Sequence, residues 1–251
     1  MKFLKSFIWL AFVFATTASF AFSQDAISIP VTEFNPEQLE EYVENPKWSI
    51  LSLPRRDKTT YTLVEMNDRT AIKGESKNSA SGLIYKVDID PNEYPIIEWS
   101  WKVDDVLEQG NYKTKDGDDY AARIYITFDY SKRKLKFGDR VKYEAIRTFT
   151  RYKIPLRALN YVWANKAETE TIAPNAYTNW VYMVAVQSGK NESGDWKFES
   201  RNIVEDYKAA FGEEPPRISG VAIMTDSDNT KAESKGYYGD IVFRSLPLND
   251  N

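Results

Sequence analysis

Several stretches of the chain alternate strictly between apolar and polar side chains. Residues 97–103 read Ile-Glu-Trp-Ser-Trp-Lys-Val, and residues 83–89 and 123–129 follow the same pattern. Successive side chains of a β-strand point to opposite faces, so a period of two predicts strands with one buried face. Residues 180–187 are apolar at nearly every position, which favours a central strand that is covered on both sides. Residues 218–224 and 237–243 complete the predicted set of strands.

Two segments with helical periodicity interrupt the strands. In residues 138–149, Asp139 is a candidate N-cap, and an apolar stripe follows it at Val141, Ala145, Ile146 and Phe149. In residues 202–216, Asn202 is a candidate N-cap and Gly212 a candidate C-terminal stop. Because no strand–helix–strand alternation occurs, we expect a mainly β fold, an antiparallel β-sandwich with two peripheral helices.

The N-terminus has the pattern of an export signal. Lys2 and Lys5 precede an apolar run over residues 7–15, and Ser19-Phe20-Ala21 fits a signal peptidase site, with cleavage after residue 23 as an alternative. We therefore expect residues 1–21 to be a signal peptide and residues 22–251 a single domain, either periplasmic or secreted. An uncleaved N-terminal anchor is the alternative. No stretch of the mature chain is apolar enough to span a membrane.

Two residue types are absent, and their absence excludes several kinds of chemistry. The chain contains no Cys and no His. Ser-His-Asp and Cys-His catalysis and His- or Cys-based metal sites are therefore excluded, which leaves carboxylates, hydroxyls, Lys, Arg and hard cations such as Ca²⁺. The expected mature chain has 31 basic and 37 acidic side chains, a formal charge of −6. This balance argues against nucleic acid as a partner.

Five sequence blocks occur in an order typical of one protein family. They are residues 96–103, 117–128, 159–165, 199–230 and 238–243. Together they resemble the bacterial domain-of-unknown-function family 3047 over about residues 50–245. The last block, an aromatic residue followed by Gly-Asp-Ile-Val-Phe, also resembles the final strand of galactose-binding-like jelly rolls, many of which are carbohydrate-binding modules. This second resemblance implies a jelly-roll form of the sandwich and raises the expectation of a calcium site.

Two acidic clusters are candidate sites. In Met-Thr-Asp-Ser-Asp-Asn-Thr (224–230), Asp226 and Asp228 follow a predicted strand with the spacing of many calcium loops, although the EF-hand pattern is not met. An Asx-turn explains them equally well. In residues 115–123, Asp118 and Asp119 precede Arg123, and adjacent carboxylates need a cation or a guanidinium group nearby. Arg123 or Arg201 are candidates for that role, in a structural network, a polar ligand cleft or a calcium site.

The polar face of the strand at 97–103 is a third candidate. If Trp99 and Trp101 are core residues, Glu98 and Lys102 face outward, and Arg123 is expected to join them there; a sugar-stacking role for the Trp side chains is the alternative. We expect a non-catalytic binding domain for a polysaccharide or envelope glycan, with Ca²⁺ as a candidate stabilising ion. The expected ligand-binding residues are Glu98, Lys102, Asp118, Asp119, Arg123, Arg201, Asp226 and Asp228, and the candidate metal ligands are Asp226, Asp228 and Asp240. The alternatives are a glycosidase or lyase, with catalytic residues not assigned, and a structural envelope protein that binds a protein partner.

Overall fold

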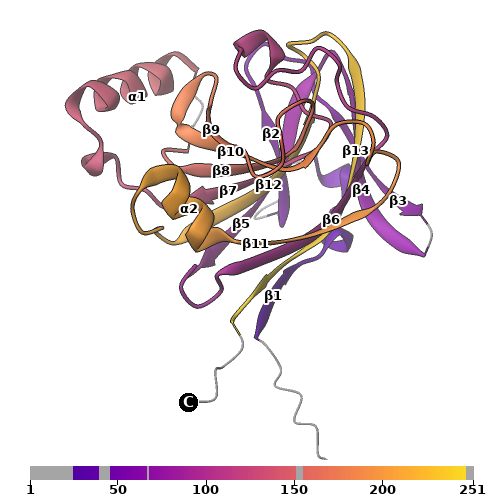
Figure 1. Ribbon diagram of the computed structural model, residues 1–251, viewed down its shortest axis with the longest axis horizontal. Helices are drawn as coiled ribbons and strands as arrows, with labels where there is room; N and C mark the ends of the chain where they lie inside the picture. Colours follow the sequence, from indigo (N-terminus) through magenta and orange to yellow (C-terminus); the bar gives the residue numbers. More distant parts are fainter. Residues whose placement is uncertain (1–24, 40–45, 67, 151–154, 247–251) are drawn as a thin grey trace, which may run out of the picture.

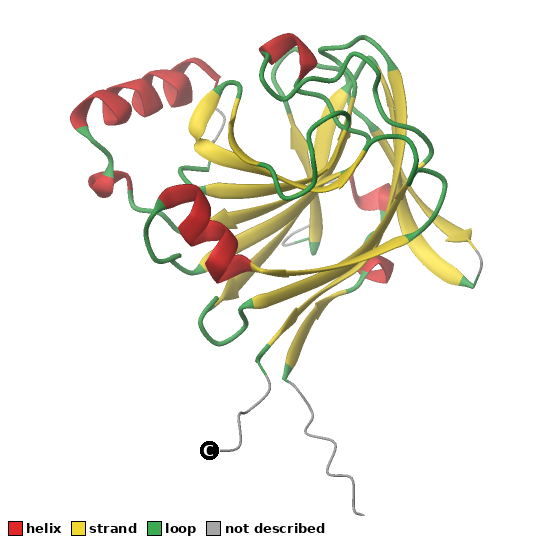
Figure 2. Cartoon of the chain, viewed as in Figure 1, coloured by secondary structure: helices red, strands yellow, loops and turns green. Residues whose placement is uncertain are grey.

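Two β-sheets form most of the molecule. The computed structural model describes residues 25–39, 46–66, 68–150 and 155–246, so the predicted signal peptide lies outside the described residues. Sheet A runs β11 (Lys197–Asn202), β6 (Ile96–Val103), β13 (Glu233–Arg244), β4 (Arg69–Lys77) and β3 (Thr60–Met66), and β1 (Ala26–Ile29) also pairs with β13. Sheet B runs β2 (Trp48–Ser52), β5 (Ala80–Ile89), β12 (Ile218–Asp226), β7 (Arg123–Phe128), β8 (Ala158–Ala164), β10 (Thr178–Ser188) and β9 (Ile172–Asn175). The sheets face each other as a sandwich (Figures 1 and 2), which confirms the predicted fold class.

Aromatic side chains from both sheets fill the middle of the sandwich. Trp99 and Trp101 of β6 are buried, and their ring centroids lie 5.4 Å apart. Trp99 packs on Tyr161 at 5.2 Å, and Trp101 packs on Trp163 at 5.9 Å, both across the gap to β8 of sheet B. The core interpretation of Trp99 and Trp101 is therefore confirmed, and their outward neighbours on β6 belong to the opposite face of sheet A.

One strand pair departs from the predicted antiparallel arrangement. β8 and β10 are parallel, with Val181 opposite Ala158 and Val184 opposite Tyr161. The chain between them forms β9, which pairs with β10 in antiparallel fashion and reverses the direction once more. Side-chain alternation assigns faces to a strand but carries no information on its direction, so the sequence pattern missed this pair.

The two predicted helices are present. α2 (Ile203–Phe211) begins after Asn202, whose side chain accepts hydrogen bonds from the backbone N–H groups of Val204 and Glu205, and it ends at Gly212 with φ of 69°. α1 (Phe137–Thr150) begins two residues before the predicted cap Asp139, which therefore lies in its first turn. Val141 of the predicted apolar stripe is 55 % exposed, because α1 lies at the edge of sheet B near β9 and β10 instead of on the core (Figure 1). No helix among the described residues is long and apolar enough to cross a membrane.

Candidate functional site

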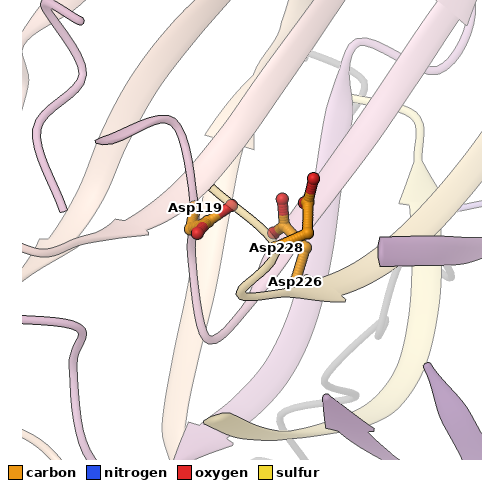
Figure 3. Close-up of side chains that lie close together, drawn as sticks. All are labelled: Asp119, Asp226 and Asp228. Carbon is orange, nitrogen blue, oxygen red and sulfur yellow. The ribbon is translucent and has the colours of Figure 1, made fainter. Parts of the chain in front are cut away.

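Three of the predicted site residues meet at one end of sheet B. Asp226 ends β12, Asp228 lies in the turn after it, and Asp119 comes from the loop before β7. One carboxylate oxygen from each of the three side chains lies within 4.8 Å of the other two, and Figure 3 shows the loop residue Asp119 facing the other two residues. All three side chains are buried. We call these residues the aspartate cluster.

Asp119 holds the turn that follows β12. Its Oδ2 accepts hydrogen bonds from the backbone N–H of Thr230 at 2.6 Å and from the Thr230 hydroxyl at 2.7 Å. Its Oδ1 accepts a third bond from the Asn229 side-chain amide at 3.0 Å. One carboxylate from a distant part of the chain thus accepts three hydrogen bonds from Asn229 and Thr230. These bonds fix the backbone conformation of the turn.

A guanidinium group compensates two buried carboxylates. Arg123, which is 4 % exposed, donates from Nη2 to Asp226 Oδ2, and its Nη1 lies 3.9 Å from Asp118 Oδ1. Asp226 Oδ1 also accepts the backbone N–H of Tyr120 at 3.2 Å. Asp118 accepts a hydrogen bond from the Asn175 side chain of β9 at 2.7 Å. Of the two arginines predicted as candidates for this role, the structure places Arg123 here.

Burial dominates the electrostatics of the cluster. Removal from water raises the pKa of Asp226 well above its usual range, although Arg123 acts in the opposite direction. Burial likewise raises the pKa of Asp118 and of Asp228, and the charge of Asp119 adds to the effect at Asp228. Arg56 reaches Asp228 from the loop after β2, with Nε 2.7 Å from Oδ2. Four carboxylates therefore face two guanidinium groups, a formal excess of two negative charges.

A raised carboxyl pKa next to a second carboxylate is also a signature of acid–base catalysis. In this cluster, however, Asp226 is 1 % exposed, and both of its oxygens are occupied by Arg123 and Tyr120. Recesses of about 240, 340 and 400 Å³ on the described surface are lined by other side chains. The burial of this carboxylate favours a structural or ion-binding role over contact with a substrate.

The outer face of sheet A carries a more accessible site. A groove of about 400 Å³ crosses it; its lining residues are Val31, Thr32, Arg69, Thr70, Glu98, Trp99, Ser100, Phe198, Gly239, Asp240, Val242 and Arg244. Arg69 Nη1 donates to the Ser100 hydroxyl at 3.1 Å, and Arg244 Nε donates to Glu98 Oε2 at 2.5 Å. Phe198 of the edge strand β11 is 68 % exposed beside these groups. We call this surface the sheet A groove.

Two local features shape the sheet A groove. The pairing of β13 with β6 is irregular between Tyr238 and Ile241, so Gly239 and Asp240 lie in a bulge. A Cβ atom on Gly239 would collide with the Ser100 hydroxyl, so any other residue here would require the Ser100 side chain to move. At the other side, the Arg69 guanidinium lies 4.9 Å from the centre of the half-buried Trp196 ring. The Arg69 side chain is thus held between the Trp196 ring and the Ser100 hydroxyl.

The structure separates the remaining predicted site residues. Lys102 shares the outer face of sheet A, where its ammonium lies 5.3 Å from the Tyr237 ring centre. Arg201 pairs instead with Asp206, with Nη2 2.7 Å from Oδ1, and with Glu170, with Nη1 2.7 Å from Oε1. Asp240 lies in sheet A and accepts the backbone N–H of Val31 at 2.7 Å, so it is not part of the aspartate cluster.

The expectation that Arg123 joins Glu98 and Lys102 on one polar face is wrong. Arg123 belongs to β7 of sheet B, whereas Glu98 and Lys102 belong to β6 of sheet A. Both strands alternate in the same way, and the sequence pattern does not tell which sheet a strand enters. For the same reason the sequence did not point to Arg69, Phe198 and Arg244. On β11, Phe198 and Glu199 point to opposite faces. This alternation was the available sequence signal that Phe198 lies on the outer face of its sheet.

Comparison with known proteins assigns a family. The profile of a family described as "Protein of unknown function (DUF3047)" matches residues 46–242. The chain belongs to the DUF3047 family. This DUF3047 chain matches no curated protein.

Similar solved structures include two kinds of protein. One is a "Family 11 Carbohydrate-Binding Module of cellulosomal cellulase Lic26A-Cel5E of Clostridium thermocellum", with 10 % sequence identity and a TM-score of 0.42. The alignment covers 89 % of the DUF3047 chain and 98 % of the carbohydrate-binding module. Another is the family 11 xylanase from Neocallimastix patriciarum, with 13 % identity, coverage of 88 % and 97 %, and a TM-score of 0.31. Likenesses of this size do not define a ligand for the DUF3047 chain.

Proposed function

We propose that this protein is an exported, non-catalytic binding domain for a polysaccharide or envelope glycan, and that the sheet A groove holds the glycan. The observation that carries the proposal is the exposed ring of Phe198 beside the groove. A large apolar side chain on a strand surface costs free energy in water unless a partner covers it. The C–H face of a pyranose ring is an apolar surface of matching size.

The polar groups of the sheet A groove suit hydroxyls. Arg69 offers N–H donors, Glu98 offers acceptor lone pairs, and the Ser100 hydroxyl offers both. Hydrogen bonds from Arg69 to Ser100 and from Arg244 to Glu98 hold these side chains in place before a ligand arrives, which lowers the entropy cost of binding. A few oriented polar groups beside an aromatic surface are typical of sites that bind hydroxyl-rich ligands.

The groove also favours binding over hydrolysis. A glycosidase needs two carboxylates that are free to exchange protons or attack the sugar. The groove contains Glu98 and Asp240, and a protein donor already occupies each of them: the Arg244 guanidinium and the Val31 N–H, respectively. Carboxylates held in this way act as fixed acceptors for hydroxyl groups.

We propose in addition that Ca²⁺ stabilises the aspartate cluster. The candidate ligands Asp119, Asp226 and Asp228 supply only oxygen atoms, the kind that Ca²⁺ prefers. Calcium–oxygen distances of about 2.3–2.6 Å allow two ligand atoms of one ion to lie up to roughly 5 Å apart, and one oxygen from each of these carboxylates lies within 4.8 Å of the others. A divalent ion would also balance the formal excess of two negative charges. Its role would be to hold loops together, away from the sheet A groove.

The glycan proposal is tested with the mature domain, residues 22–251, on a panel of neutral and acidic polysaccharides. Retention in affinity gels and new reducing ends are measured in the same samples. We expect retention without cleavage, and at least a tenfold loss of affinity in Phe198→Ala, because the stacking surface is removed.

Val141→Ala is the matched control, since it truncates an exposed apolar side chain on α1 and should bind like the parent domain. Circular dichroism and thermal melting verify that both variants are folded. The appearance of new reducing ends would show that the protein cleaves the polysaccharide and would overturn the proposal of a non-catalytic binding domain. If Phe198→Ala and the parent domain are retained equally, the sheet A groove is not the glycan-binding site.

A further inference from the structure

A second pocket lies where α1, α2 and β10 meet. Its volume is about 340 Å³, and its lining residues are Tyr130, Lys134, Leu135, Lys136, Asp139, Arg157, Asn179, Trp180, Tyr182, Ala210 and Phe211. None of these residues belongs to the sheet A groove or to the aspartate cluster. We call it the helix pocket. Figure 1 shows both helices on the side of the molecule where β9 and β10 end sheet B.

The helix pocket carries positive charge in an acidic protein. Lys134 and Lys136 belong to the run Lys-Arg-Lys-Leu-Lys at 132–136, whereas the expected mature chain has a formal charge of −6. Arg157 pairs through Nε with Glu213 Oε1 at 3.2 Å. The lining contributes three positive charges, from Lys134, Lys136 and Arg157, and one negative charge, from Asp139. Glu213 adds a second negative charge, so the net charge is +1. The local field therefore attracts an anion, and a single negative charge balances it.

Aromatic rings form the walls of the helix pocket and hold its arginine. The Arg157 guanidinium lies 4.3 Å from the Tyr130 ring centre and 4.8 Å from that of Phe211, and Arg157 Nη1 donates to the Leu156 carbonyl at 3.0 Å. Tyr182 packs edge-on against Phe211, with ring centroids 4.9 Å apart. These contacts fix the guanidinium in one orientation, as at sites that recognise planar carboxylates.

Trp180 connects the helix pocket to α1. Its ring meets Tyr143 of α1 edge-on, with centroids 5.8 Å apart, and the Lys142 ammonium lies 5.6 Å from its ring centre. The buried indole N–H of Trp180 has no acceptor among the described residues. This side chain packs α1 against β10, so a ligand between the lysines and β10 would also restrain the N-terminal part of the helix.

We propose that the helix pocket binds a small monoanionic carboxylate with an apolar or ring-shaped body, the class that includes hexuronic acids. Lys134, Lys136 and Arg157 would face the carboxylate, and the rings of Tyr130, Tyr182 and Phe211 would pack on the body. Monoanion selectivity follows from the net charge of +1, because a dianion such as phosphate would leave one charge uncompensated. The assignment is independent of whether the sheet A groove binds a glycan.

The test uses the mature domain and four probes: glucuronate, its methyl ester, glucose and inorganic phosphate. Binding is followed by calorimetry and by amide hydrogen exchange over residues 132–143. We expect glucuronate to bind at least tenfold more tightly than its ester, glucose or phosphate, and to slow exchange in α1. Affinity should fall as the salt concentration rises, because the lysines are exposed.

Matched variants locate the binding. Lys134→Met with Lys136→Met should weaken glucuronate binding at least tenfold, whereas Lys58→Met with Lys86→Met, which removes the same charge from two exposed lysines elsewhere, should not. Phe198→Ala should leave glucuronate binding unchanged, so failure of the sheet A groove and failure of the helix pocket give different results. Equal binding of glucuronate and its ester, stronger binding of phosphate, or unchanged affinity in the Lys134–Lys136 double variant would each overturn the proposal.

Discussion

The buried Arg123–Asp226 pair shows how a residue predicted to bind a ligand can serve the fold instead. The side chains of both residues are inside the protein, and neither lines a described recess. The residue types were predictable from the sequence, since Asp118, Asp119 and Arg123 are close in the chain. Their burial was not, because the loop before β7 and the turn after β12 are separated by about a hundred residues.

Removing the guanidinium from this pair should destabilise the domain strongly. In Arg123→Met we expect a loss of about 3–5 kcal/mol in the free energy of unfolding, because a buried carboxylate is left without its cation. Urea denaturation measures the change. Lys190→Met breaks the exposed pair of Lys190 with Asp105 and should leave the stability nearly unchanged. Similar losses in the two variants would contradict the buried-pair interpretation.

The pH dependence of stability follows from the raised carboxyl pKa values. The folded state raises the pKa of Asp118, Asp226 and Asp228, so it retains protons that the unfolded chain has already released. Their contribution to stability is fully present below the ordinary carboxyl pKa of about 3.9 and is lost as the pH rises through the folded-state values.

Without Ca²⁺, we therefore expect the stability of Asp228→Asn to fall less than that of the parent as the pH rises above about 4. Denaturation curves across this range measure the difference. Asp105→Asn is the control of opposite sign, because the Lys190 hydrogen bond lowers the pKa of Asp105, whose contribution appears as the pH rises. A parent domain whose stability increases over this range as steeply as that of Asp228→Asn would refute the prediction.

At the scale of elements, local signals were reliable where one segment determines its own structure. The cap residues Asn202 and Gly212 predicted both ends of α2, and alternation predicted β6 and β7 within one residue at each end. The start of α1 was missed, because Asp139 is equally favourable in the first helical turn. β1, β3, β4, β8, β9 and β11 were not predicted either. In β3, β4, β9 and β11, charged and small residues weaken the alternation.

The cap of α2 offers a direct check at this scale. Asn202→Ala removes the acceptor for the Val204 and Glu205 N–H groups and should cost about 1 kcal/mol of stability. Thermal or urea denaturation measures the loss. Asn191→Ala, in an exposed turn, is the matched control and should be nearly neutral. If the two substitutions cost the same, the cap does not stabilise the helix in the way its geometry indicates.

At the scale of the whole molecule, the aspartate cluster and the side chains that pair with it or with Asp118 join four chain segments. Arg56 comes from the loop after β2, Asp118 and Asp119 from the loop before β7, Asn175 from β9, and Asp226 and Asp228 from the end of β12. The sequence predicted a sandwich but not which strands share a sheet, because pairing depends on contacts between distant segments. That is why Arg123 and Glu98 were expected on one face and are found in different sheets.

Ca²⁺ should therefore stabilise the domain as a whole. At a free concentration of 100 times its dissociation constant, a bound ion adds about 2.7 kcal/mol of stability. We expect a higher melting temperature in Ca²⁺ than in EDTA, and no such shift in Asp119→Asn or Asp228→Asn. Mg²⁺ at the same concentration controls for ionic strength. An equal shift in both variants would place the ion elsewhere.

The pairing of β1 with β13 has a mechanical consequence. The two strands are antiparallel, Ala26 lies opposite Arg244, and the N–H of Ser245 donates to the carbonyl of Asp25, so the first and last described strands start and finish side by side. Tension applied through both ends of the domain would load this ladder at one end and open its hydrogen bonds one after another, as a zipper opens, instead of shearing them together. A protein tethered through both ends would thus release β1 at low force, while the aromatic core between the sheets stays packed.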